Sequence, residues 1–528
     1  MSQTIKYVFI ILAIICFQLN AGSDFFASQV GFDSLLITEK LLLSNLEKYV
    51  EAAQEKLTEI DGIIENISKE HPGNVDNLEN YLSNPIRAFS LLKRLVITWP
   101  EIKENLEDNT ARDNFVYIKS LHQSFDLKYP DQQDFKGASL ALARIQDTYD
   151  LNIRNLTEGI VNKKYSQRLS WIDCFYIGNF LYFSNLYKLA LVWIKESERK
   201  LLLSDDNNNS TLANLYENIA ANSIKLGLLS ESVEAIEKIS ELNPDSSGVA
   251  SRQEELMNGL GEGVLRTYKD STEYDLYKKV CRDEIVPSPS QQRNLRCRYK
   301  IGPEPYLKLA AFKMEELSLD PYAVLYYNAI SNKEIDLIKS NAQANIHIST
   351  VVGYQGLVDH RISKQAWLPY KDYDFLKPIS QRITDLTGLS MMDAEHFQVV
   401  NYGMGGHYEP HTDSFEKMEK AQKLDHGNRI ATALFYLSNV DFGGSTAFPY
   451  LSVNVKAEKG KLLYWENIHA GGDVDFRTKH AGCPVVLGNK WIANAWLRSG
   501  DQAFRRPCGL KNDNAVSVDF KQITYLNK

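Results

Sequence analysis

The sequence predicts a multidomain α + β protein, with helices in its amino-terminal half and an antiparallel β domain at its carboxyl end. Three observations predict this class. The chain has 528 residues, and at roughly 150 residues per domain that length fits three or four domains. Apolar residues recur at helical spacing as far as about residue 260. From residue 321 onward, short β-type runs alternate with glycine turns.

The composition is that of a globular protein. Hydrophobic residues make up 44% and charged residues 24%, which excludes collagen-like, low-complexity and disordered chains. The net charge is −8, and basic residues are scattered among acidic ones. This distribution argues against a protein that must neutralise phosphates. The 28 tyrosines, 22 phenylalanines and 7 tryptophans are either core residues or stacking surfaces for an unusual ligand.

Residues 1–22 read as a secretory signal peptide. Lys6 precedes an apolar run over 7–19, and small residues follow at Ala21 and Gly22. The run is shorter than the roughly 20 residues that a membrane span needs, and the alternative is a buried amino-terminal helix. The mature protein is therefore expected in the endoplasmic reticulum lumen or outside the cell. The sequons at Asn66, Asn155 and Asn209 are potential glycan acceptors.

Five cysteines remain after the signal peptide is removed, which allows at most two disulfides in an oxidising compartment. Pairing by proximity joins Cys281 to Cys297 and Cys483 to Cys508. Cys174 is then left as a buried, inert thiol in an apolar helical stretch. The chain closes without a retention tetrapeptide, so either the protein is secreted or a partner retains it.

Residues 23–140 are expected to form a helical amino-terminal domain. Apolar residues follow one another at steps of three and four along a seam: Leu42, Leu46, Tyr49, Ala53, Leu57, Ile60 and Ile64. Two interpretations stay open. The seam either packs inside a helical bundle or forms a coiled-coil dimer interface.

Residues 146–260 contain a weak internal repeat. The stretch around Ile177 resembles the stretch around Ile219, 42 residues later, and Pro244 ends the second copy. Paired helices at such a period suggest tetratricopeptide-like units with a peptide-binding face. Aromatic residues including Tyr182 and Tyr187 gather in the first copy. They are either core or ligand surface.

The remaining chain divides into a linker over 261–320, carrying Cys281 and Cys297, and a β domain over 321–528. In the second region short strands such as 397–400, 431–437 and 461–465 are separated by turn residues. This pattern predicts an antiparallel sandwich or a jelly roll, the double-stranded β-helix.

The chemistry-bearing segment of the β domain is 402–413. A dinucleotide-binding glycine loop does not fit, because the spacing differs and no helix follows. A zinc-protease helix carrying His407 and His411 does not fit either, because Pro410 breaks it. Residues two apart on a strand share a face, so His411 and Asp413 are able to reach one metal ion.

A third ligand is expected from His480, which lies 67 residues after Asp413. Two histidines and one carboxylate leave three coordination positions open, the arrangement of non-haem Fe(II) oxygenases. Those positions admit a bidentate 2-oxo acid and O₂. A buried Lys490 would pair with the distal carboxylate of 2-oxoglutarate, and the alternative for Lys490 is a surface salt bridge.

With these residues in order, the stretch 321–509 resembles the catalytic domain of collagen prolyl 4-hydroxylase α subunits. The resemblance is carried by long motifs: Asn401-Tyr402-Gly403, Tyr408-Glu409-Pro410-His411, the run 427–432, Gly443-Gly444, Gly488-Asn489-Lys490-Trp491 and the run 504–508. Upstream, the helical region and the paired helices resemble the dimerisation and peptide-substrate-binding domains of the same family.

The resemblance assigns roles by position. His411, Asp413 and His480 match the iron ligands, and Lys490 matches the holder of the 2-oxoglutarate distal carboxylate. Tyr402 and Thr446 match hydroxyl donors to that carboxylate, while Tyr408, Arg429 and Trp496 match residues near the substrate proline. The implied reaction converts 2-oxoglutarate and O₂ to succinate and CO₂ while peptidyl proline becomes 4-hydroxyproline. L-Ascorbate restores iron oxidised in uncoupled turnovers.

The resemblance also implies partners and a compartment. It implies an α₂β₂ tetramer whose β subunit is protein disulfide isomerase, which supplies retention in the endoplasmic reticulum lumen, and Pro-rich, procollagen-like chains as substrate. Rival interpretations are a non-catalytic binding subunit, and an oxygenase that acts on a non-collagen peptide or on another residue such as lysine.

Two positions depart from the family pattern. A family histidine that orients the 2-oxoglutarate C1 carboxylate is replaced here by Arg498. Arg498 is expected to act there as a weaker catalytic substitute, so Arg498→His should lower the KM for 2-oxoglutarate or raise turnover. In the helical repeat, Tyr182 is kept, but family tyrosines are replaced by Asn218, Ala221 and Ile224. We therefore expect weaker binding of long Pro-rich chains and a substrate narrower than, or different from, fibrillar collagen.

Overall fold

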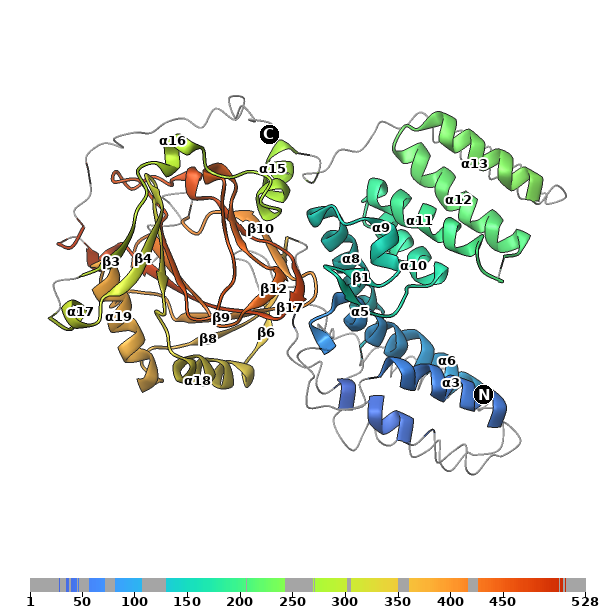
Figure 1. The fold of residues 1–528 in the computed structure, drawn as a ribbon, viewed down its shortest axis with the longest axis horizontal. Coiled ribbons are helices and arrows are strands. Elements are labelled where there is room, and N and C mark those ends of the chain that lie inside the picture. Colours follow the sequence, from blue (N-terminus) through green and yellow to red (C-terminus); the bar gives the residue numbers. More distant parts are fainter. Residues whose placement is uncertain are drawn as a thin grey trace, which may run out of the picture. The chain divides into compact units, whose positions relative to one another are not determined.

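The fold is given by a computed structural model of the chain (Figure 1). It describes residues 57–71, 81–106, 130–205, 207–242, 271–301, 305–349, 360–415 and 426–502, together with a few shorter pieces. The chain forms two compact units, Met1–Leu265 and Arg266–Lys528. Residues 1–22, predicted as a signal peptide, and Cys508 lie outside the described residues.

The first unit is helical at its amino-terminal end. Its elements there are α3 (Leu57–Glu70), α5 (Pro85–Lys93), the π-helical turn η4 (Arg94–Thr98), α6 (Trp99–Leu106), α8 (Gln132–Tyr149) and α9 (Ile153–Thr157), followed by a small hairpin, β1 (Ile160–Val161) and β2 (Lys164–Tyr165). Of the predicted seam, Leu42, Leu46 and Ile60 are buried within the single chain. Their burial supports the helical-bundle interpretation at these positions. Tyr49 and Ala53 lie outside the described residues.

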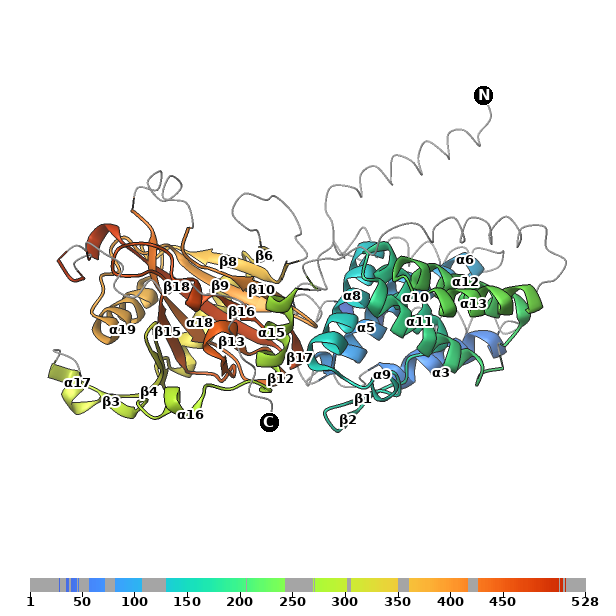
Figure 2. The same ribbon diagram turned by 90° about the horizontal axis from the view of Figure 1, so that it is seen from above.

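Two helical hairpins follow, where the internal repeat predicted paired helices (Figures 1 and 2). They consist of α10 (Trp171–Phe183), α11 (Tyr187–Leu201), α12 (Asn209–Lys225) and α13 (Leu229–Leu242). Ser170 caps α10 by accepting a hydrogen bond from the Asp173 amide, and Asn208 caps α12 in the same way. Cys174 is a buried free thiol, as predicted, and burial raises its pKa well above the usual value.

The hairpin residues that differ from the family pattern do not share one environment. Asn218 and Ala221 are half-buried on α12, and Asn218 Nδ2 donates to the carbonyl of Asn214 at 2.9 Å. Ile224 is buried and thus belongs to the packed interior. Tyr182, on α10, is half-buried and packs edge-on against Tyr187, with ring centroids 5.4 Å apart. Only two of the three substituted positions therefore lie where a ligand could reach them.

The second unit is built on β-strands. Its helices are α15 (Thr272–Cys281), α16 (Pro289–Gln292), α17 (Pro305–Leu309), α18 (Asn332–Gln343) and α19 (Lys377–Thr387). Its strands are β3 (Cys297–Lys300), β4 (Phe312–Leu319), β5 (Tyr322–Tyr327), β6 (His347–Ile348), β7 (Arg361–Ile362), β8 (Lys364–Leu368), β9 (Phe397–Tyr402), β10 (His407–His411), β11 (Arg429–Tyr436), β12 (Val440–Gly443), β13 (Thr446–Phe448), β14 (Val453–Val455), β15 (Leu462–Glu466), β16 (His480–Gly482), β17 (Val485–Gly488) and β18 (Lys490–Arg498).

These strands form two main sheets. One has the order β3-β4-β5-β15-β11-β18-β9-β8-β6, the other has the order β14-β13-β16-β10-β7, and β12 pairs with β17. A shared core of residues from both sheets includes Val400, Leu434, Phe448 and Trp465. Strand β18 is buried along its whole length, and successive side chains of a strand point to opposite faces. That alternation fixes which side chains line the interior.

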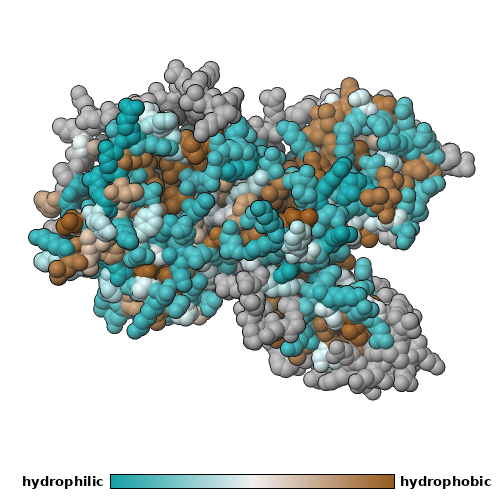
Figure 3. Space-filling model, viewed as in Figure 1, coloured by the Kyte–Doolittle hydropathy of each residue, from teal (hydrophilic) through white to brown (hydrophobic). Residues whose placement is uncertain are grey.

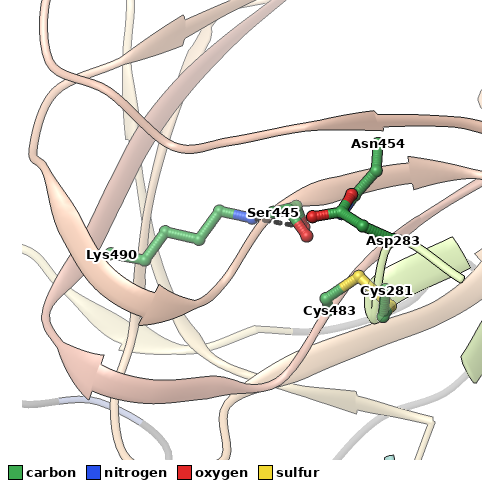
Figure 4. Close-up of a disulfide and its surroundings, with 6 residues drawn as sticks. All are labelled: Cys281, Asp283, Ser445, Asn454, Cys483 and Lys490. Carbon is green, nitrogen blue, oxygen red and sulfur yellow. Dashed lines mark hydrogen bonds between the residues drawn. A yellow bond between two sulfur atoms is a disulfide. The ribbon is translucent and has the colours of Figure 1, made fainter. Parts of the chain in front are cut away.

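The disulfide prediction was wrong in its pairing. Cys281, at the end of α15, is bonded to Cys483, 202 residues away, with a Cα–Cα distance of 5.9 Å, whereas Cys297 is a free, exposed thiol. Proximity in sequence failed as a guide because α15 packs against β13 and β14, next to the strand that precedes Cys483. Figure 4 shows this bond beside Ser445 and Lys490.

The described part of the chain contains no helix long and apolar enough to cross a membrane. On the face shown in Figure 3, hydrophilic residues are spread over both units, with hydrophobic residues interspersed among them. This face therefore has a mixed polar and apolar character.

Candidate active site

Three potential metal ligands meet at the edge between two neighbouring strands. His411 ends β10 and His480 begins β16, and these two residues pair directly across the antiparallel strands. Asp413 follows two residues after His411. Its Oδ1 lies 3.8 Å from His411 Nε2 and its Oδ2 lies 3.7 Å from His480 Nε2. The ligand atoms of the three residues all lie within 4.8 Å of one another, so one ion can bind all three.

Backbone carbonyls orient both imidazoles toward the same point. His411 Nδ1 lies 2.8 Å from the Glu409 carbonyl and His480 Nδ1 lies 3.1 Å from the Thr478 carbonyl. A carbonyl oxygen only accepts, so each Nδ1 carries the proton and each Nε2 keeps its lone pair. Burial lowers the pKa of His411 and of His480. Both rings are therefore held in the neutral form that binds a metal ion.

The carboxylate of Asp413 is positioned by a chain of buried hydrogen bonds. Thr432 Oγ1 donates to Asp413 Oδ2 at 2.6 Å, and Asn467 Nδ2 donates to Thr432 Oγ1 at 2.9 Å. Burial acts to raise the pKa of Asp413, but the neighbouring imidazoles and Arg429 outweigh it and leave this pKa below its usual value. The group is thus ionised, and its partners fix the ligand as outer-shell groups do in metal sites.

The triad opens into a cavity of about 290 Å³ that Lys490 also lines. Lys490 is 1% exposed, and its Nζ has a backbone acceptor, the Ser445 carbonyl, at 3.4 Å. Burial lowers the pKa of Lys490 to about 7. No carboxylate of the described residues forms an ion pair with it. A buried cation beside a metal site, without an acidic partner of its own, fits an anionic ligand.

Tyr402 and Thr446 lie close to Lys490. Lys490 and Tyr402 pair across β18 and β9, with Lys490 Nζ 5.1 Å from the centre of the Tyr402 ring. Burial raises the pKa of Tyr402 to about 12, so its hydroxyl stays protonated. Thr446 Oγ1 accepts a hydrogen bond from Tyr436 at 2.8 Å, which leaves its own hydroxyl hydrogen available. Both residues line the cavity and can donate to an anion.

Aromatic residues form another part of the cavity wall. The ring of Tyr408 stacks on His411, with centroids 3.5 Å apart. The Arg429 guanidinium lies 3.8 Å from the centre of the Trp496 ring, and Trp496 packs against Trp367. These planar surfaces suit an uncharged ring.

Arg498 is placed differently from the sequence-based expectation. It continues the face of β18 that carries Lys490 and Trp496, but it is not among the residues lining the cavity. Instead, its Nη1 donates to Glu395 Oε1 at 2.9 Å. Glu395 also accepts from Arg429 Nε at 2.5 Å and from Nη2 at 2.7 Å. Arginine prefers a carboxylate within reach of its planar fork, and Glu395 supplies one.

Sequence reasoning did not single out several residues that the structure brings to this site. They are Thr432, Asn467, Glu395, Arg361, Gln365, Gln398 and Asn494. The available signal was a polar residue inside an apolar strand run, as at Gln398 and Asn494. Such residues are buried only with a partner, so they mark a polar interior. Tyr182 belongs to the helical unit and is not one of the cavity residues.

Two neutral imidazoles and one carboxylate that leave coordination positions open define the class of mononuclear non-haem metal oxygenases. The donor set fits Fe(II), and the unpaired buried Lys490 fits the distal carboxylate of 2-oxoglutarate. Comparisons with known proteins agree. Residues 28–163 match the model of the prolyl 4-hydroxylase alpha-subunit N-terminal region, and residues 397–498 match the 2OG-Fe(II) oxygenase superfamily.

Relatives extend this similarity over almost the whole chain. Prolyl 4-hydroxylase subunit alpha-2 of Caenorhabditis elegans is 33% identical, over 93% of this chain and 95% of its own length. The human subunit alpha-1 is 33% identical, over 95% and 98%. A solved viral collagen prolyl hydroxylase from Paramecium bursaria Chlorella virus-1 is 25% identical over 34% of this chain and 96% of its own, with a TM-score of 0.28. The chain belongs to the prolyl 4-hydroxylase α-subunit family.

Proposed function

We propose that this chain is the catalytic α subunit of a prolyl 4-hydroxylase that converts peptidyl proline to 4-hydroxyproline with Fe(II), 2-oxoglutarate and O₂. One observation carries the proposal: the ligands His411, Asp413 and His480 line the same cavity as the unpaired, buried Lys490. A non-catalytic binding subunit has no physical need for that combination. L-Ascorbate is the reductant that we expect to keep the metal in its ferrous form.

In this function Lys490, Tyr402 and Thr446 bind the distal carboxylate of 2-oxoglutarate. The lysine supplies the charge and the two hydroxyls donate hydrogen bonds, in a region where burial strengthens each interaction. A metal ion, when bound by the triad, supplies the activation of O₂ with electrons from the co-substrate. The chain's own contribution is to hold the co-substrate in one orientation and to exclude water.

Tyr408, Arg429 and Trp496, which line the same cavity, would hold the target proline. A pyrrolidine ring is uncharged and is best bound by planar faces. Glu395 fixes Arg429 through two hydrogen bonds, at 2.5 and 2.7 Å, so the guanidinium stays over Trp496. Arg498, which shares the same carboxylate, is assigned here as a positioning residue of this wall and not as a co-substrate ligand.

The finer architecture belongs to the same proposal. The helical hairpins α10–α13 would act as a tetratricopeptide-like unit that binds peptide, with Tyr182 on its surface, and the β unit as the jelly-roll oxygenase domain. The amino-terminal helices would mediate dimerisation. We further propose an α₂β₂ assembly with protein disulfide isomerase as β subunit, retained in the endoplasmic reticulum lumen.

Mass spectrometry tests the proposal. The protein, co-expressed with protein disulfide isomerase, is incubated with a (Pro-Pro-Gly)ₙ peptide, Fe(II), 2-oxoglutarate and ascorbate. A mass gain of one oxygen on proline, lost in His411→Ala, is the expected result. Oxygen on lysine of a mixed peptide would support the rival substrate class. Metal and 2-oxoglutarate binding without any modified peptide would support a non-catalytic subunit.

A further inference from the structure

A row of buried polar side chains crosses one wall of the cavity. Arg361 (β7), Gln365 (β8), Gln398 (β9) and Asn494 (β18) are each at most 8% exposed, and all four line the cavity. Arg361 Nη2 donates to Gln365 Oε1 at 3.2 Å, Gln398 Nε2 donates to the same oxygen at 2.7 Å, and Asn494 Nδ2 donates to Gln398 Oε1 at 3.2 Å.

The direction of these hydrogen bonds is fixed by chemistry. A guanidinium only donates, so the Gln365 atom facing Arg361 must be the oxygen. That oxygen accepts from Gln398, whose amide nitrogen therefore points to Gln365 and whose oxygen points to Asn494. Asn494 must in turn donate with its nitrogen. The row consequently ends in the Asn494 Oδ1 acceptor.

Asn494 Oδ1 has no hydrogen-bond partner, although the atom is buried. An unsatisfied acceptor away from water is costly, so a donor supplied by a bound molecule would stabilise this part of the site. Asn494 lies on the same face of β18 as Ile492 and Trp496, which line the cavity with it. Residues two apart on a strand are about 7 Å apart, so Asn494 is a direct neighbour of Trp496, in the wall assigned to the target proline.

This inference rests on the proposed function, under which the donor to Asn494 Oδ1 must come from 2-oxoglutarate or from the bound peptide. 2-Oxoglutarate has two carboxylates and a keto oxygen, all acceptors, and a prolyl residue has no N–H. The donor nearest the proline ring in a peptide is the N–H of the following residue, bonded directly to the prolyl carbonyl carbon. We propose that Asn494 Oδ1 accepts a hydrogen bond from the backbone N–H of the residue that follows the target proline.

Asn494 is then a specificity-determining residue. A following residue without an N–H, such as a second proline, would leave Asn494 Oδ1 buried and unpaired in the complex. Sites built to bind a hydrogen-bonding group reject analogues that lack it. The discrimination concerns the peptide backbone, and it is independent of the following side chain.

A pair of peptides tests the proposal without changing side chains. One contains Ala-Pro-Gly, and in the other an ester replaces the amide between proline and glycine, which removes only the N–H. Wild-type enzyme is expected to hydroxylate the ester about 10-fold less efficiently in kcat/KM, the usual effect of a lost hydrogen bond to a buried group. In Asn494→Leu, which has no acceptor, the ratio should fall to about 1, whereas Asn494→Asp keeps an acceptor and should still prefer the amide.

Equal kcat/KM for the two peptides with wild-type enzyme would overturn the inference, and so would an undiminished preference in Asn494→Leu. The wild-type comparison decides even when the leucine variant fails to fold. Failure of the proposed function looks different: wild-type enzyme would then hydroxylate neither peptide, and both proposals would fall together. Hydroxylation of the amide peptide with no preference removes only the role of Asn494.

Discussion

Arg498 and Glu395 form an ion pair, with Arg498 Nη1 2.9 Å from Glu395 Oε1. The pair links the end of β18 to the segment before β9, and Glu395 in turn holds Arg429 over Trp496. Arg498 therefore binds the carboxylate that positions Arg429 in the wall proposed for the substrate. This changes the expected effect of substitutions at position 498.

Arg498→Ala should raise the KM for the peptide several-fold and leave the KM for 2-oxoglutarate nearly unchanged, because Glu395 loses one partner and Arg429 becomes less well fixed. Steady-state kinetics with each substrate varied in turn measures both constants. Glu395→Gln should shift the peptide KM in the same direction. A rise confined to the KM for 2-oxoglutarate would instead show that Arg498 binds the co-substrate.

Thr432→Val should weaken metal binding by about 10-fold, since Asp413 loses the hydroxyl that holds its Oδ2 at 2.6 Å. Competitive titration with a metal-sensitive dye measures the affinity. Thr432→Ser keeps the hydroxyl and is the matched control. Equal metal affinity in the wild type and the valine variant would show that Thr432 does not position the ligand.

Binding of 2-oxoglutarate should weaken above pH 7. The pKa of Lys490 is about 7 in the free protein, so the ammonium is present below that pH and is lost above it. Only the charged form attracts the distal carboxylate, and the Kd should rise by up to about 10-fold per pH unit. Calorimetry on Mn²⁺-loaded protein between pH 6 and 8.5 measures this. Lys490→Arg stays charged throughout and should give a flat profile, whereas a flat profile in the wild type would contradict the prediction.

Loss of the Cys281–Cys483 disulfide should lower the free energy of unfolding by about 3–5 kcal/mol, because the bond closes a loop of roughly 200 residues. Cys281→Ser and Cys483→Ser should be destabilised alike, while Cys297→Ser, at a free exposed thiol, should not be. Chemical denaturation compares the three. Non-reducing peptide mapping adds a direct check, since a fragment joining Cys281 to Cys297 would refute the pairing.

Tyrosines introduced on α12 should strengthen binding of Pro-rich peptides. Asn218 and Ala221 are half-buried on α12, and two aromatic contacts of about 1 kcal/mol each amount to roughly 30-fold in Kd. Calorimetry with (Pro-Pro-Gly)ₙ compares the double variant Asn218→Tyr/Ala221→Tyr with the wild type. Micromolar affinity in the wild type would show that the groove does not need these tyrosines.

The sequence predicted that His411, Asp413 and His480 would meet, because strand alternation and residue type are local properties. His411 and Asp413 are two apart, and His480 begins an apolar strand run. It predicted the helical hairpins for the same reason, through their period. The family membership and the oxygenase class were also predicted, and the comparisons confirm both.

Other features depended on contacts between distant segments. Cys281 reaches Cys483 only because α15 packs beside β13 and β14, and no spacing rule contains that information. Arg498 was interpreted from the family histidine that it replaces, but Glu395, 103 residues away, decides where its guanidinium lies. The row that ends at Asn494 crosses four strands, so its residues look unrelated until the sheet assembles them.

His411 and His480 face each other in register across β10 and β16, and this has a consequence for how the chain can change over evolution. Side chains alternate along a strand, so inserting or deleting one residue within either strand turns every later side chain to the opposite face. The 68 residues between the two histidines can lengthen or shorten in their loops without moving either imidazole. Insertions and deletions are therefore tolerated in the loops between these two strands, but not within the strands themselves.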